Sequence, residues 1–171
     1  VFLVVVTVIF SLSVLAYGDR MLFANWKPMP ETWVLWLNTG ILIIGGIAMQ
    51  WAKINTKRDN IVGVRDGLIF GGVLTLAFLL GQLYAWGQMV ELGYYANLNT
   101  ANAFFYMLTG LHGIHMLGGL VAWARSVLKL REISQSNGSI ADVRLSVELC
   151  TTYWHYLLLI WLIMFTLLLL S

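Results

Sequence analysis

The stretch LSVELCTTYWHYLLLIWLIMFTLLLL, residues 145–170, decides the fold class of this chain. It is almost entirely apolar and is longer than the roughly 20 residues that a helix needs to cross the ~30 Å hydrocarbon core of a bilayer. Four other apolar runs occupy residues 1–17, 32–52, 68–90 and 102–128. Backbone groups in lipid must be paired within a helix or a closed barrel, and these runs lack the alternation of barrel strands. We therefore predict an all-α membrane bundle of five transmembrane helices.

The composition indicates that nearly all of the chain lies in membrane spans. The chain has 171 residues, of which 60% are apolar and 11% are charged, far from the average of soluble proteins. Five spans and short connections account for nearly all of it, so we predict that residues 1–171 form a single transmembrane domain. The one cysteine, Cys150, excludes a disulfide framework. The basic residues gather in loops beside the spans, a pattern that indicates membrane topology rather than nucleic-acid binding.

The distribution of Lys and Arg predicts the orientation. Alternate connections lie on the same side of a membrane, and the cytoplasmic side carries the excess of Lys and Arg. The second and fourth connections hold eight of these residues: Lys53, Lys57, Arg58, Arg65, Arg125, Lys129, Arg131 and Arg144. The other side holds only Arg20 and Lys27. We expect the amino end to be cytoplasmic and the carboxyl end to be outside, with residues 1–17 a span rather than a signal peptide.

Four ionisable residues within the predicted spans are the functional candidates: His112, His115, Glu148 and His155. Such groups are expensive in lipid and mark functional or interhelical contacts. His112 and His115 share one face of a helix because they are three residues apart, and Glu148 and His155 share a face because they are seven apart. We predict that all four form an interhelical polar cluster that fixes helix packing.

A catalytic metal site is the alternative reading of these histidines, because imidazole is a common ligand of copper, zinc and iron. Three His and one Cys are too few for a haem plus a copper site or for a dinuclear copper site. We therefore predict no catalytic, cofactor-binding or metal-binding residue in this chain.

Glycines are frequent in the spans and favour close packing of the helices.

Two motifs carry a resemblance to a known family. The stretch Thr109–His115, TGLHGIH, resembles the Thr-Gly-Phe-His-Gly-x-His signature of subunit III of haem–copper oxidases, the cytochrome c and quinol oxidase subunit III family. Glu148 followed by the YWHY of residues 153–156 is similar to the last helix of that family. Asn38-Thr39 and Gly81-Gln82 also resemble family positions. The family-motif residues expected to pack helices together are Asn38, Gln82, Gly110, Gly113, Gly119 and Trp161.

The resemblance implies a short, five-helix form of an accessory, non-catalytic subunit. Its partners would be the catalytic subunit and the other oxidase subunits, which hold haem and copper, reduce oxygen and pump protons. The family implies support of proton uptake, resistance to inactivation during turnover, and structural phospholipid in a cleft between the first two of these helices and the remaining three. The resemblance is also compatible with membership in a larger respiratory supercomplex and with location in a bacterial plasma membrane. Candidate lipid contacts are Trp33, Trp36, Arg144 and Trp154.

The sequence departs from the family at two carboxylates, which are replaced by Val6 and Leu158. The resemblance therefore does not extend, at these two positions, to the carboxylates that the family places near the proton-entry region. Two alternatives stay open: the equivalent subunit of a quinol oxidase or nitric-oxide reductase, and a small proton-coupled transporter whose His and Glu line a proton path.

Overall fold

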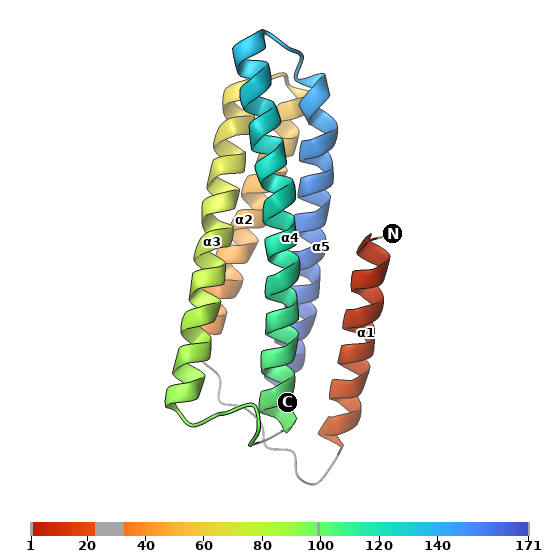
Figure 1. Cartoon of the computed structure of the whole chain (residues 1–171), viewed down its shortest axis with the longest axis vertical. Coiled ribbons are helices and arrows are strands. Elements are labelled where there is room, and N and C mark those ends of the chain that lie inside the picture. Colours follow the sequence, from red (N-terminus) through yellow and green to blue (C-terminus); the bar gives the residue numbers. More distant parts are fainter. Residues whose placement is uncertain (1, 23–32, 99, 171) are drawn as a thin grey trace.

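A computed structural model describes residues 2–22, 33–98 and 100–170 of the chain. The described residues form helices and turns and contain no strand. The helices are α1 (Phe2–Met21), α2 (Trp33–Lys57), α3 (Ile61–Glu91), α4 (Thr100–Ser136) and α5 (Ala141–Leu170) (Figure 1). The predicted all-α class is confirmed.

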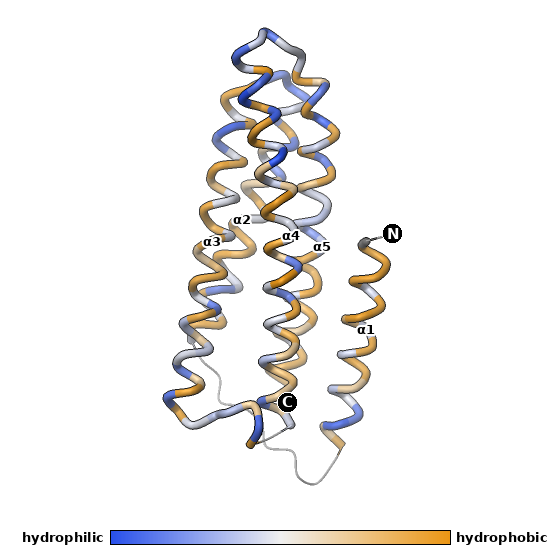
Figure 2. Tube along the Cα trace, viewed as in Figure 1, coloured by the Kyte–Doolittle hydropathy of each residue, from blue (hydrophilic) through white to orange (hydrophobic). Residues whose placement is uncertain are grey.

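All five helices are long and apolar enough to cross a membrane. Hydrophobic residues dominate the middle of the bundle, and hydrophilic residues are concentrated toward its ends (Figure 2). Two helices extend well beyond the predicted spans, since α3 begins at Ile61 and α4 continues to Ser136. The reason is that hydropathy identifies the part of a helix that lies in lipid, whereas good helix formers such as Arg, Lys, Glu and Leu prolong it into water.

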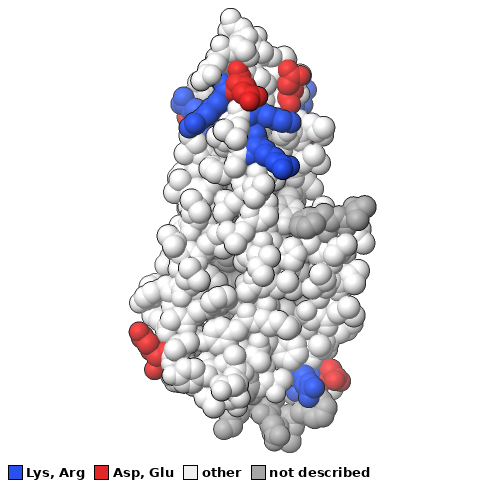
Figure 3. Space-filling model, in the orientation of Figure 1, with Lys and Arg blue, Asp and Glu red and all other residues white. Residues whose placement is uncertain are grey.

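One end of the bundle is strongly basic. The carboxyl ends of α2 and α4 meet the amino ends of α3 and α5 there (Figure 1), and Lys and Arg side chains gather at that end (Figure 3). This basic end carries the eight residues Lys53, Lys57, Arg58, Arg65, Arg125, Lys129, Arg131 and Arg144. Arg20 lies at the end of α1, on the opposite side. Lys27 and residue 32, where the second span was predicted to begin, lie outside the described residues.

Helices α2, α3, α4 and α5 pack together, and α1 lies against α4 and α5 (Figure 1). In the described part of the chain α1 makes no contact with α2, so the first two helices do not form a pair. The division into two helices and three that the family resemblance implies is therefore not the division seen here. Instead α2 contacts both α3 and α5.

A short turn links α2 to α3 and makes them an antiparallel pair. Asn60 caps α3 by accepting a hydrogen bond from the Gly63 amide at 3.2 Å, which pairs one of the free N–H groups of the first turn. The Asn60 side chain in turn donates to the Asn55 side chain at 3.1 Å. Asp59 occupies the left-handed region, with φ 52°, a conformation that Asp tolerates better than most residues.

Small residues bring α2 and α3 into close contact. A Cβ atom added at Gly67 would lie 2.8 Å from the Ala52 Cβ and 3.0 Å from the Ala48 carbonyl oxygen. At Gly71 it would lie 2.7 Å from the Met49 sulfur. At Gly67, where the neighbours are Cβ and backbone atoms, only glycine permits this approach. In lipid, where apolar side chains gain little by leaving their solvent, such packing is a main source of helix association.

Tryptophan N–H groups provide polar links between helices. Trp154 of α5 donates to the Thr75 hydroxyl of α3 at 2.9 Å, and both side chains are buried. The same hydroxyl donates to the Gly71 carbonyl at 2.8 Å, so its donor and one acceptor site are used. Trp123 of α4 donates to the Leu68 carbonyl of α3 at 2.7 Å. These bonds pair buried polar groups that would be costly to leave unpaired in an apolar interior.

Gly67→Ala should destabilise the bundle by about 1–3 kcal/mol, because the added methyl group meets backbone and Cβ atoms that cannot move aside. Unfolding by sodium dodecyl sulfate, followed by circular dichroism, measures the effect. Gly87→Ala is the matched control on the same helix, since nothing lies within 4 Å of its added Cβ. Equal stability of the two variants would contradict the close approach of α2 and α3.

A double-mutant cycle of Trp154→Phe and Thr75→Val should give a coupling energy of roughly 0.6–1.7 kcal/mol, the range of interhelical hydrogen bonds in membrane proteins. The same detergent titration measures all four proteins. Thr152→Val is the control, because this exposed hydroxyl bonds only the Glu148 carbonyl of its own helix. A coupling energy near zero would rule out a contribution from the Trp154–Thr75 bond.

Candidate functional site: a polar and aromatic layer in the core

Residues from the family motifs of four helices meet in one layer across the bundle. We call it the core layer, and it contains Asn38 and Thr39 of α2, Phe78 and Gln82 of α3, His112 of α4 and Trp161 of α5. All six side chains are buried. The layer thus joins four helices, and the contacts within it decide what the site can do chemically.

His112 is completely buried among aromatic rings. Its ring centroid lies 5.3 Å from that of Trp161, 5.9 Å from that of Phe78 and 6.4 Å from that of Phe10. Neither ring nitrogen has a hydrogen-bond partner among the described residues. The imidazole is held by ring contacts from three other helices and does not reach the molecular surface.

Asn38 and Gln82 form the amide part of the layer. The Asn38 side-chain amide donates to the Gln82 side-chain oxygen at 3.5 Å, a long hydrogen bond between α2 and α3. Gly81 makes room for this contact, because a Cβ atom there would lie 2.1 Å from the Asn38 oxygen. The Asn-Thr and Gly-Gln motifs, which are weak signals separately, are therefore two sides of one contact.

Trp161 connects the rest of the layer. Its indole N–H donates to the Thr39 hydroxyl at 2.9 Å, and Thr39 donates to the Leu35 carbonyl of its own helix at 2.8 Å. The Phe78 ring packs edge-on against Trp161 with centroids 5.0 Å apart, a favourable geometry for aromatic pairs. These contacts fix the position of the indole beside His112.

The four ionisable residues expected to cluster lie in two separate places. His112 and His115 face the interior, where His115 packs on Phe10 with centroids 5.6 Å apart. Glu148 is half-buried and His155 is exposed, both on the outer face of α5. No hydrogen bond or ion pair between described residues joins Glu148 or His155 to the other two histidines. The inward position next to His155 is occupied by Trp154, which turns His155 outward by about 100° around the helix.

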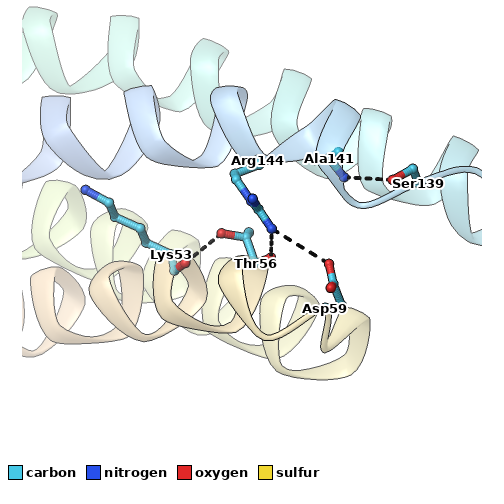
Figure 4. Close-up of polar contacts among 6 residues, drawn as sticks. All are labelled: Lys53, Thr56, Asp59, Ser139, Ala141 and Arg144. Carbon is cyan, nitrogen blue, oxygen red and sulfur yellow. Dashed lines mark hydrogen bonds and ion pairs between the residues drawn. The ribbon is translucent and has the colours of Figure 1, made fainter.

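The candidate lipid contacts also lie in different parts of the bundle. Trp33 and Trp36 are exposed at the start of α2, at the end opposite the basic end. Arg144 lies at the basic end, where its guanidinium donates to the Thr56 carbonyl at 3.1 Å and lies 3.8 Å from an Asp59 carboxylate oxygen (Figure 4). Trp154 is enclosed in the core. A single lipid headgroup cannot reach Arg144 and the two exposed tryptophans together.

The motif glycines have different surroundings. At Gly119 an added Cβ would lie 2.8 Å from the Tyr153 ring and 2.9 Å from the Trp154 ring, so this glycine seats both aromatic residues against α4. At Gly110 the nearest atom would be 3.6 Å away, on Trp86. Nothing lies within 4 Å of an added Cβ at Gly113. The two residues that stand where the family has carboxylates also have different surroundings. Val6 is buried, and Leu158 packs near Gly46.

The described residues contain no group of three His, Cys, Asp or Glu side chains that could hold a metal ion. The core layer offers amide, hydroxyl, indole and imidazole groups that are enclosed by apolar rings. Such an arrangement can fix the positions of the four helices relative to one another. Gln82 also lines an apolar pocket between α3 and α4.

Sequence reasoning missed two residues, the Phe78 ring of the core layer and the Thr75 hydroxyl that pairs with Trp154, and it named Thr39 only as part of a motif. Helical spacing holds a signal for the two missed residues, since Thr75, Phe78 and Gln82 recur at intervals of three and four along α3. That spacing places all three on one buried face. The partner of each tryptophan N–H depends on how helices distant in sequence meet, and no local pattern encodes it.

Residues 2–170 match the protein family described as "Cytochrome c oxidase subunit III". A protein named "Cytochrome c oxidase subunit 3" from Thermostichus vulcanus is 30% identical over 152 residues, covering 87% of this chain and 73% of that protein. The "Probable cytochrome c oxidase subunit 3" of Mycobacterium tuberculosis is 28% identical over 145 residues, 83% of this chain and 70% of that protein. A "Cytochrome c oxidase subunit 3" from Drosophila yakuba is 28% identical over 83% of this chain and 53% of its own length.

The match extends over all five helices and includes every residue of the core layer. The resemblance first carried by the TGLHGIH and YWHY motifs is thus confirmed over nearly the whole chain. This chain is an integral membrane protein that belongs to the cytochrome c oxidase subunit III family.

Proposed function

We propose that this chain is the accessory third subunit of a proton-pumping haem–copper terminal oxidase and has no catalytic group of its own. The partner subunits hold the haem and copper, reduce oxygen to water and pump protons. The chain stabilises the catalytic subunit and holds structural phospholipid in a bacterial respiratory membrane, with its amino end on the cytoplasmic side. Family membership and the excess of Lys and Arg at the basic end support this proposal.

The observation that carries the proposal is a polar stripe on the outer face of α5. The stripe consists of Glu148, Thr152 and His155, and His155 is exposed near the middle of this 30-residue helix. Charged side chains at the centre of a bilayer cost ~2.5–3.5 kcal/mol on insertion scales, and ionisable residues within spans, including His, almost always face other protein groups or a water-filled cavity. A surface of this kind is expected to be covered by polar groups of another membrane helix, as in a subunit of a larger complex.

The closed interior supports an accessory role over the transporter alternative. A proton path needs its ionisable groups in one connected, water-accessible line. His112 lies in a fully buried aromatic enclosure, and Glu148 and His155 lie on the opposite, outward side of α5. The apolar outer surface instead offers wide areas for contact with lipid and with neighbouring subunits.

Purification in mild detergent through a tag on this chain should recover haem- and copper-containing subunits with oxygen-reducing activity. An optical spectrum, metal analysis and mass spectrometry of the eluate measure this. The identity of the partners separates a cytochrome c oxidase from a quinol oxidase or a nitric-oxide reductase. Recovery of the chain alone with its own bound metal, or with proton-coupled transport after reconstitution, would overturn the proposal.

The double variant Glu148→Leu/His155→Leu should recover roughly tenfold less haem per tagged chain, because polar groups of the partner helix would lose their hydrogen bonds inside the bilayer. Haem absorbance relative to the amount of tagged chain is the readout. Glu148→Gln/His155→Gln is the matched control, since amides keep hydrogen-bonding capacity and should retain most of the haem. Unchanged recovery with the leucine variant would mean that the stripe is not a subunit contact.

A further inference from the structure

A groove runs between α3 and α4 in the half of the bundle next to the basic end. It has a volume of about 340 Å³, which falls within the ~300–1,000 Å³ of typical ligand sites. Leu68 and Trp123 form its floor, and the walls are the apolar side chains Ile69, Val73, Leu76, Val127 and Leu130. The groove is therefore suited to an apolar, elongated ligand.

Trp123 gives the groove its shape. The indole lies across Gly72, where an added Cβ would be 2.4 Å from the ring, and its N–H donates to the Leu68 carbonyl at 2.7 Å. The ring is thus held flat between the two helices instead of projecting into lipid. Because it is fixed at both the ring and the N–H, the floor of the groove is rigid before any ligand binds.

The mouth of the groove carries positive charge and a hydroxyl group. Arg65 of α3, Arg131 of α4 and Ser134 of α4 line it, and all three are exposed. Arg65 lies 3.0 Å from the carboxylate of its neighbour Asp66, but both side chains are more than half exposed, and an exposed pair of this kind contributes little. Two guanidinium groups facing one mouth are well suited to a phosphate, which arginine binds through paired hydrogen bonds.

The length of the groove corresponds to one leaflet. From Arg65 at the mouth to Leu76 at the far end, α3 rises by roughly 16 Å. Half of the ~30 Å hydrocarbon core of a bilayer is about 15 Å. A fatty acyl chain that starts at the arginines therefore ends near the middle of the membrane, where the groove also ends.

We propose that the α3–α4 groove binds one phospholipid with an anionic headgroup from the leaflet at the basic end. Arg65, Arg131 and Ser134 hold the phosphate, and one acyl chain lies along Leu68, Val73 and Trp123. The inference deepens the proposed lipid-holding role by giving it a place, and that place differs from Trp33, Trp36 and Arg144. It also fits the proposed orientation, because the cytoplasmic leaflet is the anionic one.

The test compares two charge-matched double variants in the complex purified through a tag on this chain. Arg65→Gln/Arg131→Gln removes the charges at the mouth, and Arg58→Gln/Arg125→Gln removes two exposed charges from the same end outside the groove. Phospholipid is extracted and counted per complex. We expect the groove variant to lose about one phospholipid per chain and the control to lose none.

The affinity of the groove for an anionic lipid is then measured. The protein is transferred from neutral detergent to nanodiscs of phosphatidylcholine that contain increasing fractions of phosphatidylglycerol. The groove variant should need roughly tenfold more phosphatidylglycerol for half-maximal quenching of tryptophan by a brominated form of that lipid. Val73→Trp, which fills the groove and keeps both arginines, should abolish the quenching difference between the two lipids.

Three results would overturn the inference: equal lipid loss in the two double variants, equal binding of the neutral and the anionic lipid, or a partner helix found in the groove. The outcome is independent of the proposed subunit role. If the chain purifies without oxidase subunits, the proposed function fails, whereas lipid counts on the isolated chain still decide whether the groove holds an anionic phospholipid.

Discussion

The close approach of α2 and α3 is the constraint on which the rest of the structure depends. Gly67 and Gly71 allow α3 to lie against Ala52 and Met49, and the Asn60 cap fixes the turn that joins the two helices. This pair then forms the surface on which α5 packs, so that Trp154 and Trp161 reach Thr75 and Thr39. In a membrane the hydrophobic effect gives no direction to helix pairing. Close backbone contact and interhelical hydrogen bonds supply that direction instead.

The same packing divides polar groups between the interior and the outer surface. His112, Asn38 and Gln82 are enclosed, and they hold helices together. Glu148, His155 and the arginines at the basic end face outward, where lipid or another subunit can meet them. In such a bundle the interior serves stability and the surface serves recognition. This distribution supports the accessory role proposed above, in which contacts with neighbouring subunits and lipid carry the function.

Much of the fold and part of the candidate site could be predicted from residues alone. The apolar runs predicted five helices, and the spacing of His112 and His115 indicated a common face, which the structure turns toward the interior. The spacing of Glu148 and His155 also predicted a common face of their helix. It could not show whether that face points into the bundle or outward. Periodicity fixes the relation of residues on one helix, whereas the rotation of that helix depends on its neighbours. Trp154 illustrates this, since it was expected at lipid and lies in the core.

By itself the sequence determined the membrane class, the number of helices, the basic end and the family, because each depends on local composition, on spacing along one helix or on a contiguous motif. Only the tertiary structure decided that α1 stands apart from α2, that the motif residues of four helices share one layer, and that Trp123 shapes a groove beside two arginines. These features depend on contacts between residues far apart in the chain. Such contacts follow from which small residues let which helices approach, a property of pairs of surfaces that no single segment contains.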